Sequence, residues 1–473
     1  MRSTSRSRRT AAASVRADSV AGRLWNSRLA TLLAAALLLA SACTTGGSDD
    51  PPSAGPATPG ATPISGGTVS FGVVGEPATY DPYSPRASDL TYALVRPLFP
   101  SLFRFLPGGS TEPLLAESLE PQGDGVLIRL RALRWSSGRP VVAGDVLRSI
   151  ARARPPSGFA TIEDARARGP RALLVEGVVA DWERTLATFA YVLPGGRVSG
   201  VPRVSAGPFA VRRHTPGLGL VFERNPRWTG DPPLLDRVRV RFTQSLDVLL
   251  ALLRRGRLDA AALPMSVNLD DRLELLGLDH HESLGWESVY LDLEGTELSR
   301  RQRVRLWRAV DRDAIASGFV RDDGRLANTL YPAPGPDGLE GPFSGSLGRA
   351  GRAPEAPVRI AASNSDELTR LVQRALFRQL QTSGFEVELL GIEPRVFEGR
   401  WRVSAPADVA IRRRAGAPGL ADGPRAARAL DALPLFHVES VVAHAGGLRE
   451  LRPNPTFEGP LWNIERWWRV PDL

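Results

Sequence analysis

The chain has 473 residues, of which 42% are hydrophobic and 23% are charged, an ordinary composition for a folded protein. This length predicts two to four domains with a substantial core, which excludes a peptide or a small staple-dependent module. The longest apolar run, residues 29–42, is too short to span a bilayer in a mature protein, so a multi-span channel or permease is excluded.

The net charge of +9 gives little reason to expect a nucleic-acid partner. Residues 1–42 carry seven Arg and one Asp, so the other 431 residues carry 53 basic and 50 acidic groups. All 60 basic residues are Arg, which a GC-rich genome explains better than any demand of the fold. We therefore expect no nucleic-acid binding, and single Arg residues are weak evidence for anion recognition.

The N-terminal segment is typical of a bacterial signal peptide that ends at a lipidated cysteine. Arg residues precede an apolar stretch, and the small residues Ala40-Ser41-Ala42 precede Cys43. Residues 1–42 are predicted to be the signal peptide, with Cys43 lipidated; the alternative is an ordinary signal peptide that leaves Cys43 unmodified. Residues 43–65, rich in Pro, Gly, Ser and Thr, are predicted to be a flexible tether. We expect a lipoprotein secreted across the cytoplasmic membrane and anchored to its outer face.

From residue 66 onward, strand-like and helix-like segments follow one another in mixed order. Residues 67–74 and 126–133 alternate apolar and polar side chains, which predicts strands, and Asp145 is expected to be the N-cap of a helix. Further strands are expected at 207–212, 218–223, 258–263, 385–390 and 408–411, and helices at 246–253 and 367–380. This order predicts an α/β chain with both parallel and antiparallel pairing.

A series of short fragments resembles one known family. In the first part of the chain they are Gly66-Gly67-Thr68, Gly75-Glu76-Pro77, Asp81-Pro82, Leu115-Ala116-Glu117-Ser118 and Trp135-Ser136-Ser137-Gly138. Later fragments are Ala206-Gly207-Pro208-Phe209, Glu223-Arg224-Asn225-Pro226, Ala309-Val310-Asp311-Arg312-Asp313 and Pro453-Asn454-Pro455-Thr456-Phe457. In this order, across residues 66–468, they resemble the oligopeptide, dipeptide and nickel solute-binding proteins of ABC importers.

The resemblance implies a two-lobed clamp of the type II periplasmic-binding-protein-like class, with a small extra subdomain in the first lobe. Lobe one would comprise residues 66–98, 203–283 and 436–473, with the subdomain at 99–202, and lobe two would be residues 284–435. A ligand would bind between the lobes, and closure would present a surface to the permease subunits.

The sequence departs from the family pattern after residues 408–411. Where relatives continue into a stretch that bears Trp and Asp, this chain has Arg412-Arg413-Arg414 and reaches Leu433 within about twenty residues. In peptide-binding relatives an acidic group in this region pairs with the amino terminus of the ligand, and the sequence alone does not place that acid here. One hypothesis is that Arg413 and Arg414 bind an anionic ligand; the alternative is a solvated surface run.

Three aromatic residues, Trp286, Tyr290 and Trp401, are candidates for ligand contact, because flat side chains grip a ligand with little loss of entropy. Core or rim packing is the alternative for each of them. The pair His280-His281, with Asp279 and Glu282, could hold a metal, but neighbouring side chains on a strand point apart. We therefore expect no metal site and no cofactor.

The sequence contains no GxSxG elbow, Walker loop or HExxH motif, so we expect no enzyme. The leading prediction is a membrane-anchored receptor that captures a peptide-like or other small polar solute and delivers it to an ABC permease. The alternative is a non-transporting scaffold or regulatory lipoprotein of the cell envelope that reuses the same fold.

Overall fold

A computed structural model describes residues 62–470, apart from 85, 154–161, 180, 189–190, 267, 318–348, 365, 394–395, 398–406 and 416–429. The side chains of residues 283–286, 414–415 and 439 are also outside the description. Cys43, Trp401 and the side chains of Trp286 and Arg414 therefore lie outside the described residues. Residues Thr58–Leu473 form one compact unit. Within the described part, no helix is both long and apolar enough to cross a membrane.

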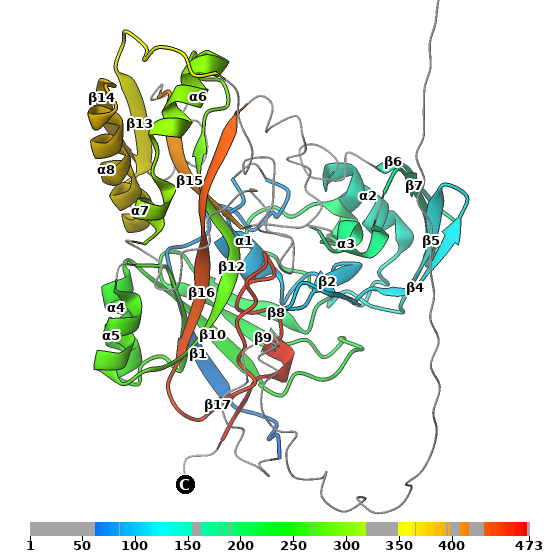
Figure 1. Cartoon of the computed structure of the whole chain (residues 1–473). Coiled ribbons are helices and arrows are strands. Elements are labelled where there is room, and N and C mark those ends of the chain that lie inside the picture. The colour runs from blue at the N-terminus through cyan, green and yellow to red at the C-terminus, as the bar shows by residue number, and fades with distance from the viewer. Residues whose placement is uncertain are drawn as a thin grey trace, which may run out of the picture. The chain divides into compact units, whose positions relative to one another are not determined.

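The largest sheet has ten strands in the order β14-β13-β15-β12-β16-β11-β1-β10-β9-β8. Its strands are β1 (Thr68–Val74), β8 (Phe209–Thr215), β9 (Gly219–Arg224), β10 (Arg237–Thr243), β11 (Ala260–Leu263), β12 (Asp279–Asp292), β13 (Val358–Ser363), β14 (Val387–Ile392), β15 (Val409–Ala415) and β16 (Ala432–His444). β1 runs parallel to β10 and β11, and β13 runs parallel to β14 and β15. The long antiparallel pair β12 and β16 joins these two parallel groups (Figure 1).

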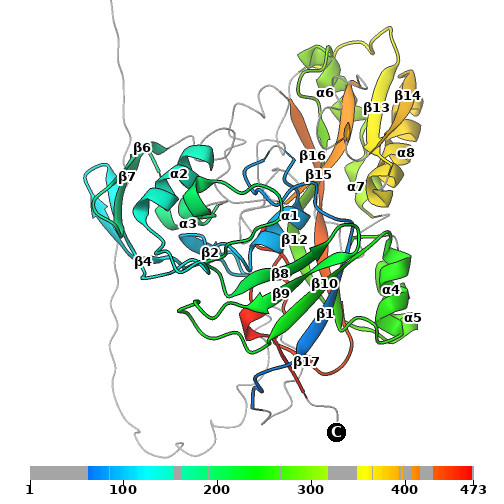
Figure 2. The ribbon, with the colours of Figure 1, turned by 180° about the vertical axis from the view of Figure 1, so that it is seen from behind.

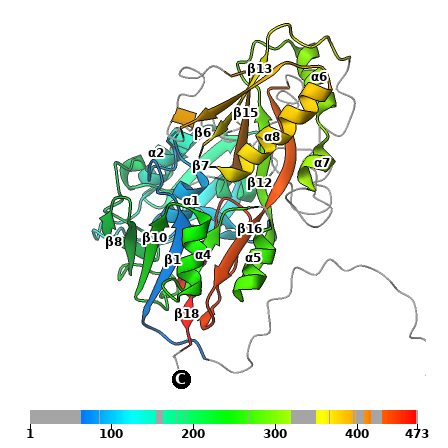
Figure 3. The same cartoon turned by 90° about the vertical axis from the view of Figure 1, so that its left-hand side faces the viewer.

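Helices pack on both parallel groups of this sheet. α4 (Leu246–Arg254) contacts β1, β10 and β11, and α5 (Leu269–Leu276) contacts β12. α8 (Glu367–Thr382) contacts β13, β14 and β15, as Figure 3 shows, and α6 (Arg300–Ala309) packs against α8. α7 (Arg312–Ala316) contacts β16.

The sequence of α8 shows why this segment is helical. Asp366 is the N-cap, and its side chain accepts a hydrogen bond from the backbone N–H of Thr369. Leu368, Val372, Leu376 and Leu380 recur every four residues, and all four are buried. One apolar stripe therefore faces the sheet, and Gly384, with a φ of 81°, follows the end of the helix.

A second, antiparallel sheet has the order β4-β5-β7-β6 and lies within residues 99–202 (Figure 2). Its strands are β4 (Ala116–Gln122), β5 (Gly125–Leu130), β6 (Ile162–Ala167) and β7 (Ala172–Gly177). The other elements are α1 (Asp89–Val95), α2 (Ala143–Ala153), α3 (Trp182–Ala187), the small strand pairs β2 (Phe103–Phe105) with β3 (Thr111–Pro113) and β17 (Leu448–Arg449) with β18 (Trp468–Arg469), and the 3-10 turns η2 (Pro194–Gly196) and η4 (Ile464–Arg466).

Buried side chains form separate core clusters. The first includes Phe71, Trp135 and Trp467, and the ring centroids of Phe71 and Trp467 are 5.5 Å apart. A second cluster packs α8 against the strands around β15, and a third lies between α4, α5 and β16. The predicted α/β class is confirmed, because the ten-stranded sheet has both parallel and antiparallel strand pairs and helices pack on it.

Two local predictions are wrong. Asp145 is not an N-cap, because α2 begins at Ala143; the buried carboxylate of Asp145 instead accepts hydrogen bonds from Trp135, Arg139 and two backbone N–H groups. The strand predicted at 408–411 extends to Ala415, so the three arginines 412–414 belong to the sheet. A strand can contain these charges when its partner strands supply opposite charges.

Candidate functional site

The candidate site is centred on Arg413, which lies on β15 beside β12. Its Nε is 2.6 Å from Oε1 of Glu287, and its Nη2 is 2.9 Å from Oε2 of the same residue. The two side chains thus form parallel charge-assisted hydrogen bonds, the strongest geometry available to an Arg–carboxylate pair. The Arg413 side chain is only 19% exposed and that of Glu287 22% exposed.

Two further carboxylates lie near the same guanidinium. Oδ2 of Asp366, the N-cap of α8, is 3.6 Å from Nη1 of Arg413. Asp89, the first residue of α1, also acts electrostatically on Arg413. Elements far apart in the sequence therefore contribute to one cluster, defined here as Arg413, Glu287, Asp366 and Asp89 and called the Arg413 cluster.

The charges of the Arg413 cluster favour a cationic partner. Burial alone would lower the pKa of Arg413, but Glu287 and Asp366 raise it well above its usual range, so the guanidinium stays charged. With the three carboxyl groups ionised, one positive charge stands against three negative ones. Among the four side chains of the cluster, carboxylates thus outnumber guanidinium groups, an arrangement that can bind a cationic group.

The neighbouring residues on β12 and β15 make different contacts. Nη1 of Arg412 is 3.8 Å from Oδ2 of Asp292, and its guanidinium lies 5.5 Å from the centre of the Phe397 ring. Tyr290 pairs with Arg412 in the strand register, is 9% exposed and packs in the first core cluster. Its proposed contact with a ligand stays a prediction.

A serine and a histidine also meet between β12 and β16. Nδ1 of His437 is 2.8 Å from Oγ of Ser288, a distance that could serve nucleophilic catalysis at an exposed site. Both residues are buried, with 0% and 2% exposure for Ser288 and His437. A substrate cannot reach this pair, so it stabilises the strand pairing instead.

Among the predicted site residues, the structure describes the side chains of Arg413 and Tyr290, while Trp401 and the side chains of Trp286 and Arg414 lie outside the described residues. Arg413 is not part of a solvated surface run, because Glu287 and Asp366 bind it. Sequence reasoning did not find these carboxylates. Asp366 could have been found as an N-cap before a predicted helix, but its approach to Arg413 depends on the sheet order.

Comparisons with known proteins agree with this fold. Residues 110–417, more than half of the chain, match the family model described as the middle part of bacterial extracellular solute-binding proteins, family 5. A curated relative, the peptidoglycan-binding protein YepA of Agrobacterium fabrum, is 26% identical over 229 residues, a match that covers 41% of this chain and 37% of that protein.

Solved structures are similar over most of the chain. The oligopeptide-binding protein AppA of Bacillus subtilis, in complex with a nonapeptide, has a TM-score of 0.68 at 16% identity, covering 87% of this chain and all of that one. NikZ of Campylobacter jejuni, in complex with Ni(L-His), has a TM-score of 0.67 at 16% identity, covering 85% and 99%. The predicted periplasmic-binding-protein-like fold is thereby confirmed, and it is a fold of binding proteins. The chain belongs to family 5 of the bacterial extracellular solute-binding proteins.

Proposed function

We propose that this protein is a membrane-anchored receptor that captures a peptide-like or other small polar solute with an amino group and delivers it to an ABC permease. The observation that carries the proposal is the excess of carboxylates around Arg413. A ligand ammonium that leaves water needs a counter-charge, and this cluster supplies it. The similarity to AppA, which was solved with a nonapeptide, supports the same ligand class.

The carboxylates have different roles in this proposal. Glu287 is engaged by two hydrogen bonds from Arg413, so it positions the guanidinium. Asp89 is exposed, and Asp366 is held less tightly, at 3.6 Å from Arg413. Asp89 and Asp366 are therefore the proposed partners of the ligand ammonium. In the proposed division, Asp89 belongs to lobe one (66–98, 203–283 and 436–473), whereas Asp366 belongs to lobe two (284–435). A ligand bound by both would favour the closed form.

The test compares ligands with and without a positive amino terminus. The full-length protein is screened by thermal shift against peptides, peptidoglycan fragments and organic anions, because a ligand that binds the folded form stabilises it. Any peptide found is then titrated with a free and an acetylated amino terminus. We expect the acetylated form to bind at least tenfold more weakly. Equal binding of the two forms would show that the protein does not recognise the ligand's ammonium group.

The matched variant is Asp366→Asn. Asparagine is as good an N-cap as aspartate, so α8 keeps its start while the negative charge is lost. Asp181→Asn is the control, because Asp181 caps α3 in the same way, through a hydrogen bond from the Arg184 N–H, and belongs to none of the elements that form the Arg413 cluster. Asp366→Asn should weaken binding of the peptide with a free amino terminus and leave binding of the acetylated peptide unchanged. Asp181→Asn should change the binding of neither peptide.

The membrane anchor is proposed from the sequence of the leader. Cys43 would carry the lipid, and residues 43–65 would tether the folded body to the outer face of the membrane. Cys43→Ser should move the protein from the membrane fraction into the soluble extracytoplasmic fraction. A variant that stays in the membrane fraction would exclude lipidation as the anchor.

The scaffold alternative makes a different prediction. A scaffold or regulatory lipoprotein would purify from its host without a small molecule, would be stabilised by none of the ligands and would co-purify with an envelope protein. Native mass spectrometry of the protein from its own host separates the two functions, because a receptor with a tight ligand retains it.

A further inference from the structure

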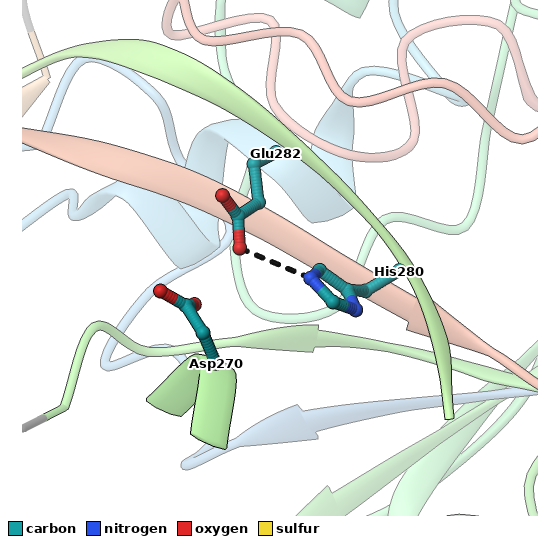
Figure 4. A group of neighbouring side chains, drawn as sticks. All are labelled: Asp270, His280 and Glu282. Carbon is teal, nitrogen blue, oxygen red and sulfur yellow. Dashed lines mark ion pairs between the residues drawn. The ribbon is translucent and has the colours of Figure 1, made fainter. Parts of the chain in front are cut away.

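The second group of interest lies at the start of β12, apart from the Arg413 cluster. His280 and Glu282 are two residues apart on this strand, so their side chains point to the same side. Asp270, in the first turn of α5, completes the group (Figure 4). The donor atoms of the three side chains all lie within 4.8 Å of one another.

The geometry points to a divalent metal site, and we propose that Asp270, His280 and Glu282 together bind a transition-metal ion such as Zn²⁺. One nitrogen and two carboxylate oxygens are a common donor set for this ion, with a fourth position left for water. The proposal concerns residues outside the Arg413 cluster and does not depend on the proposed function.

The hydrogen bond of the other imidazole nitrogen supports this assignment. Nδ1 of His280 lies 3.4 Å from the carbonyl oxygen of Leu278, so in the tautomer with the proton on Nδ1 this nitrogen donates to that carbonyl. In a neutral ring Nε2 then presents a lone pair. A metal-binding histidine usually has this arrangement, with the second nitrogen donating to a carbonyl that fixes the orientation of the ring.

Nε2 of His280 and the Glu282 carboxylate lie close enough for one cation to bind both. Nε2 of His280 is 3.1 Å from Oε1 of Glu282, which is itself an acceptor. Either a second proton on the ring or a metal ion can lie between them. Two donors on a tetrahedral Zn²⁺ are about 3.3–3.6 Å apart, given bond lengths of about 2.0–2.2 Å, so a small separation of the pair would give ligand spacing.

The donor set suits a divalent ion. Asp270 and Glu282 offer carboxylate oxygens and His280 offers an imidazole nitrogen to the same small volume. The His280 and Glu282 side chains are 27% and 34% exposed, so an ion can enter from solvent.

The neighbouring histidines provide matched controls. His281 follows His280 on β12, but its ring lies 5.1 Å from that of His444 on β16, so it faces a different group. Removing His281 or His444 therefore changes a nearby imidazole without touching the proposed ligands. His280→Gln, Asp270→Asn and Glu282→Gln each remove one ligand with little change of volume.

The experiment uses the full-length protein purified through a tag without histidines, treated with a chelator and dialysed. Zn²⁺ is titrated by calorimetry and counted by native mass spectrometry, and Co²⁺ reports the geometry through its visible absorption. We expect one ion per chain, at least tenfold weaker binding in each of the three ligand variants, and unchanged binding in His281→Gln and His444→Gln. Circular dichroism verifies that each variant is folded.

Three results would overturn the proposal. The first is the absence of Zn²⁺ and Co²⁺ binding by the folded wild-type protein. The second is binding that the three ligand variants leave unchanged, and the third is binding that His281→Gln or His444→Gln weakens as much as His280→Gln does.

Discussion

Arg413 and Glu287 bind each other through two parallel hydrogen bonds although 126 residues separate them in the sequence. β15 and β12 are neighbours in the sheet, so this distance in the chain becomes contact in space. Because both side chains are largely buried, neither can lose its partner and simply return to water.

The first prediction is that Arg413→Met lowers the free energy of unfolding by about 2 kcal/mol. This is less than the loss usually found when one partner of a fully buried ion pair is removed, because the side chains of Arg413 and Glu287 are each about one-fifth exposed. Much of the loss comes from Glu287, which would stay buried without its counter-charge. In the double variant Arg413→Met/Glu287→Gln, the loss should be smaller than the sum of the single losses. Urea unfolding of the four proteins measures this coupling, with Arg412→Met as the control on the same strand. Additive losses would contradict the pairing.

A second prediction concerns Gly207, which lies in the Ala206-Gly207-Pro208-Phe209 motif. A Cβ at this position would clash with the backbone oxygen of Pro97, and backbone cannot move aside as a side chain can. We expect Gly207→Ala to lower the free energy of unfolding by about 1–3 kcal/mol through overpacking.

Gly108→Ala is the control for this substitution, because no atom lies within 4 Å of its added Cβ. It should change the unfolding midpoint little. If the two variants unfold at the same denaturant concentration, the close approach to Pro97 is not what requires glycine in the motif.

Hydrophobic periodicity predicted much of the fold. The helix expected at 367–380 is α8, and the strand expected at 67–74 is β1. Apolar residues about four apart lie on one side of a helix, and alternating apolar residues lie on one side of a strand, so each pattern identifies its structure. These signals act over a few residues, which is why they can be recognised in one sequence.

The candidate site was less predictable because it depends on sheet order. The sequence pointed to Arg413, but three consecutive arginines are compatible with an anion site and with a solvated surface run. The charge of the site depends on Glu287 and Asp366, which contact Arg413 in the fold. No local sequence pattern links these two residues to Arg413. The same holds for Asp270, which only the packing of α5 beside β12 brings to His280.

The third prediction tests the apolar stripe of α8. Leu376 is fully buried in the second core cluster, so Leu376→Ala should reduce stability by about 2–5 kcal/mol, the sum of lost burial and the cavity left behind. Leu389 on β14 is 37% exposed, and Leu389→Ala should cost much less. Thermal and urea unfolding measure both, and a comparable loss in the two variants would contradict the assigned face of α8.

The fourth prediction is a pH dependence that originates at Asp145. Burial alone would raise the pKa of this carboxyl, but hydrogen bonds from Arg139, from the Gly195 N–H and from Trp135 lower it below its ordinary value of 3.8. The folded protein therefore binds a proton at Asp145 less readily than the unfolded chain does. It follows that the stabilisation is present above pH 3.8 and is lost as the pH falls through the lower, folded-state pKa.

Asp145→Asn should remove this acid-sensitive contribution. At pH 7 the variant should be about 2 kcal/mol less stable than the wild type, since the side chain is buried while its Arg partners are half exposed. As the pH falls below 3.8 the two unfolding curves should converge, because the wild type then loses what the variant already lacks. Glu120→Gln is the control, since the ion pair of Glu120 with Arg129 is exposed and should change the pH profile far less. A difference between wild type and Asp145→Asn that stays constant down to the acid limit would show that the carboxylate acts through packing and not through its charge.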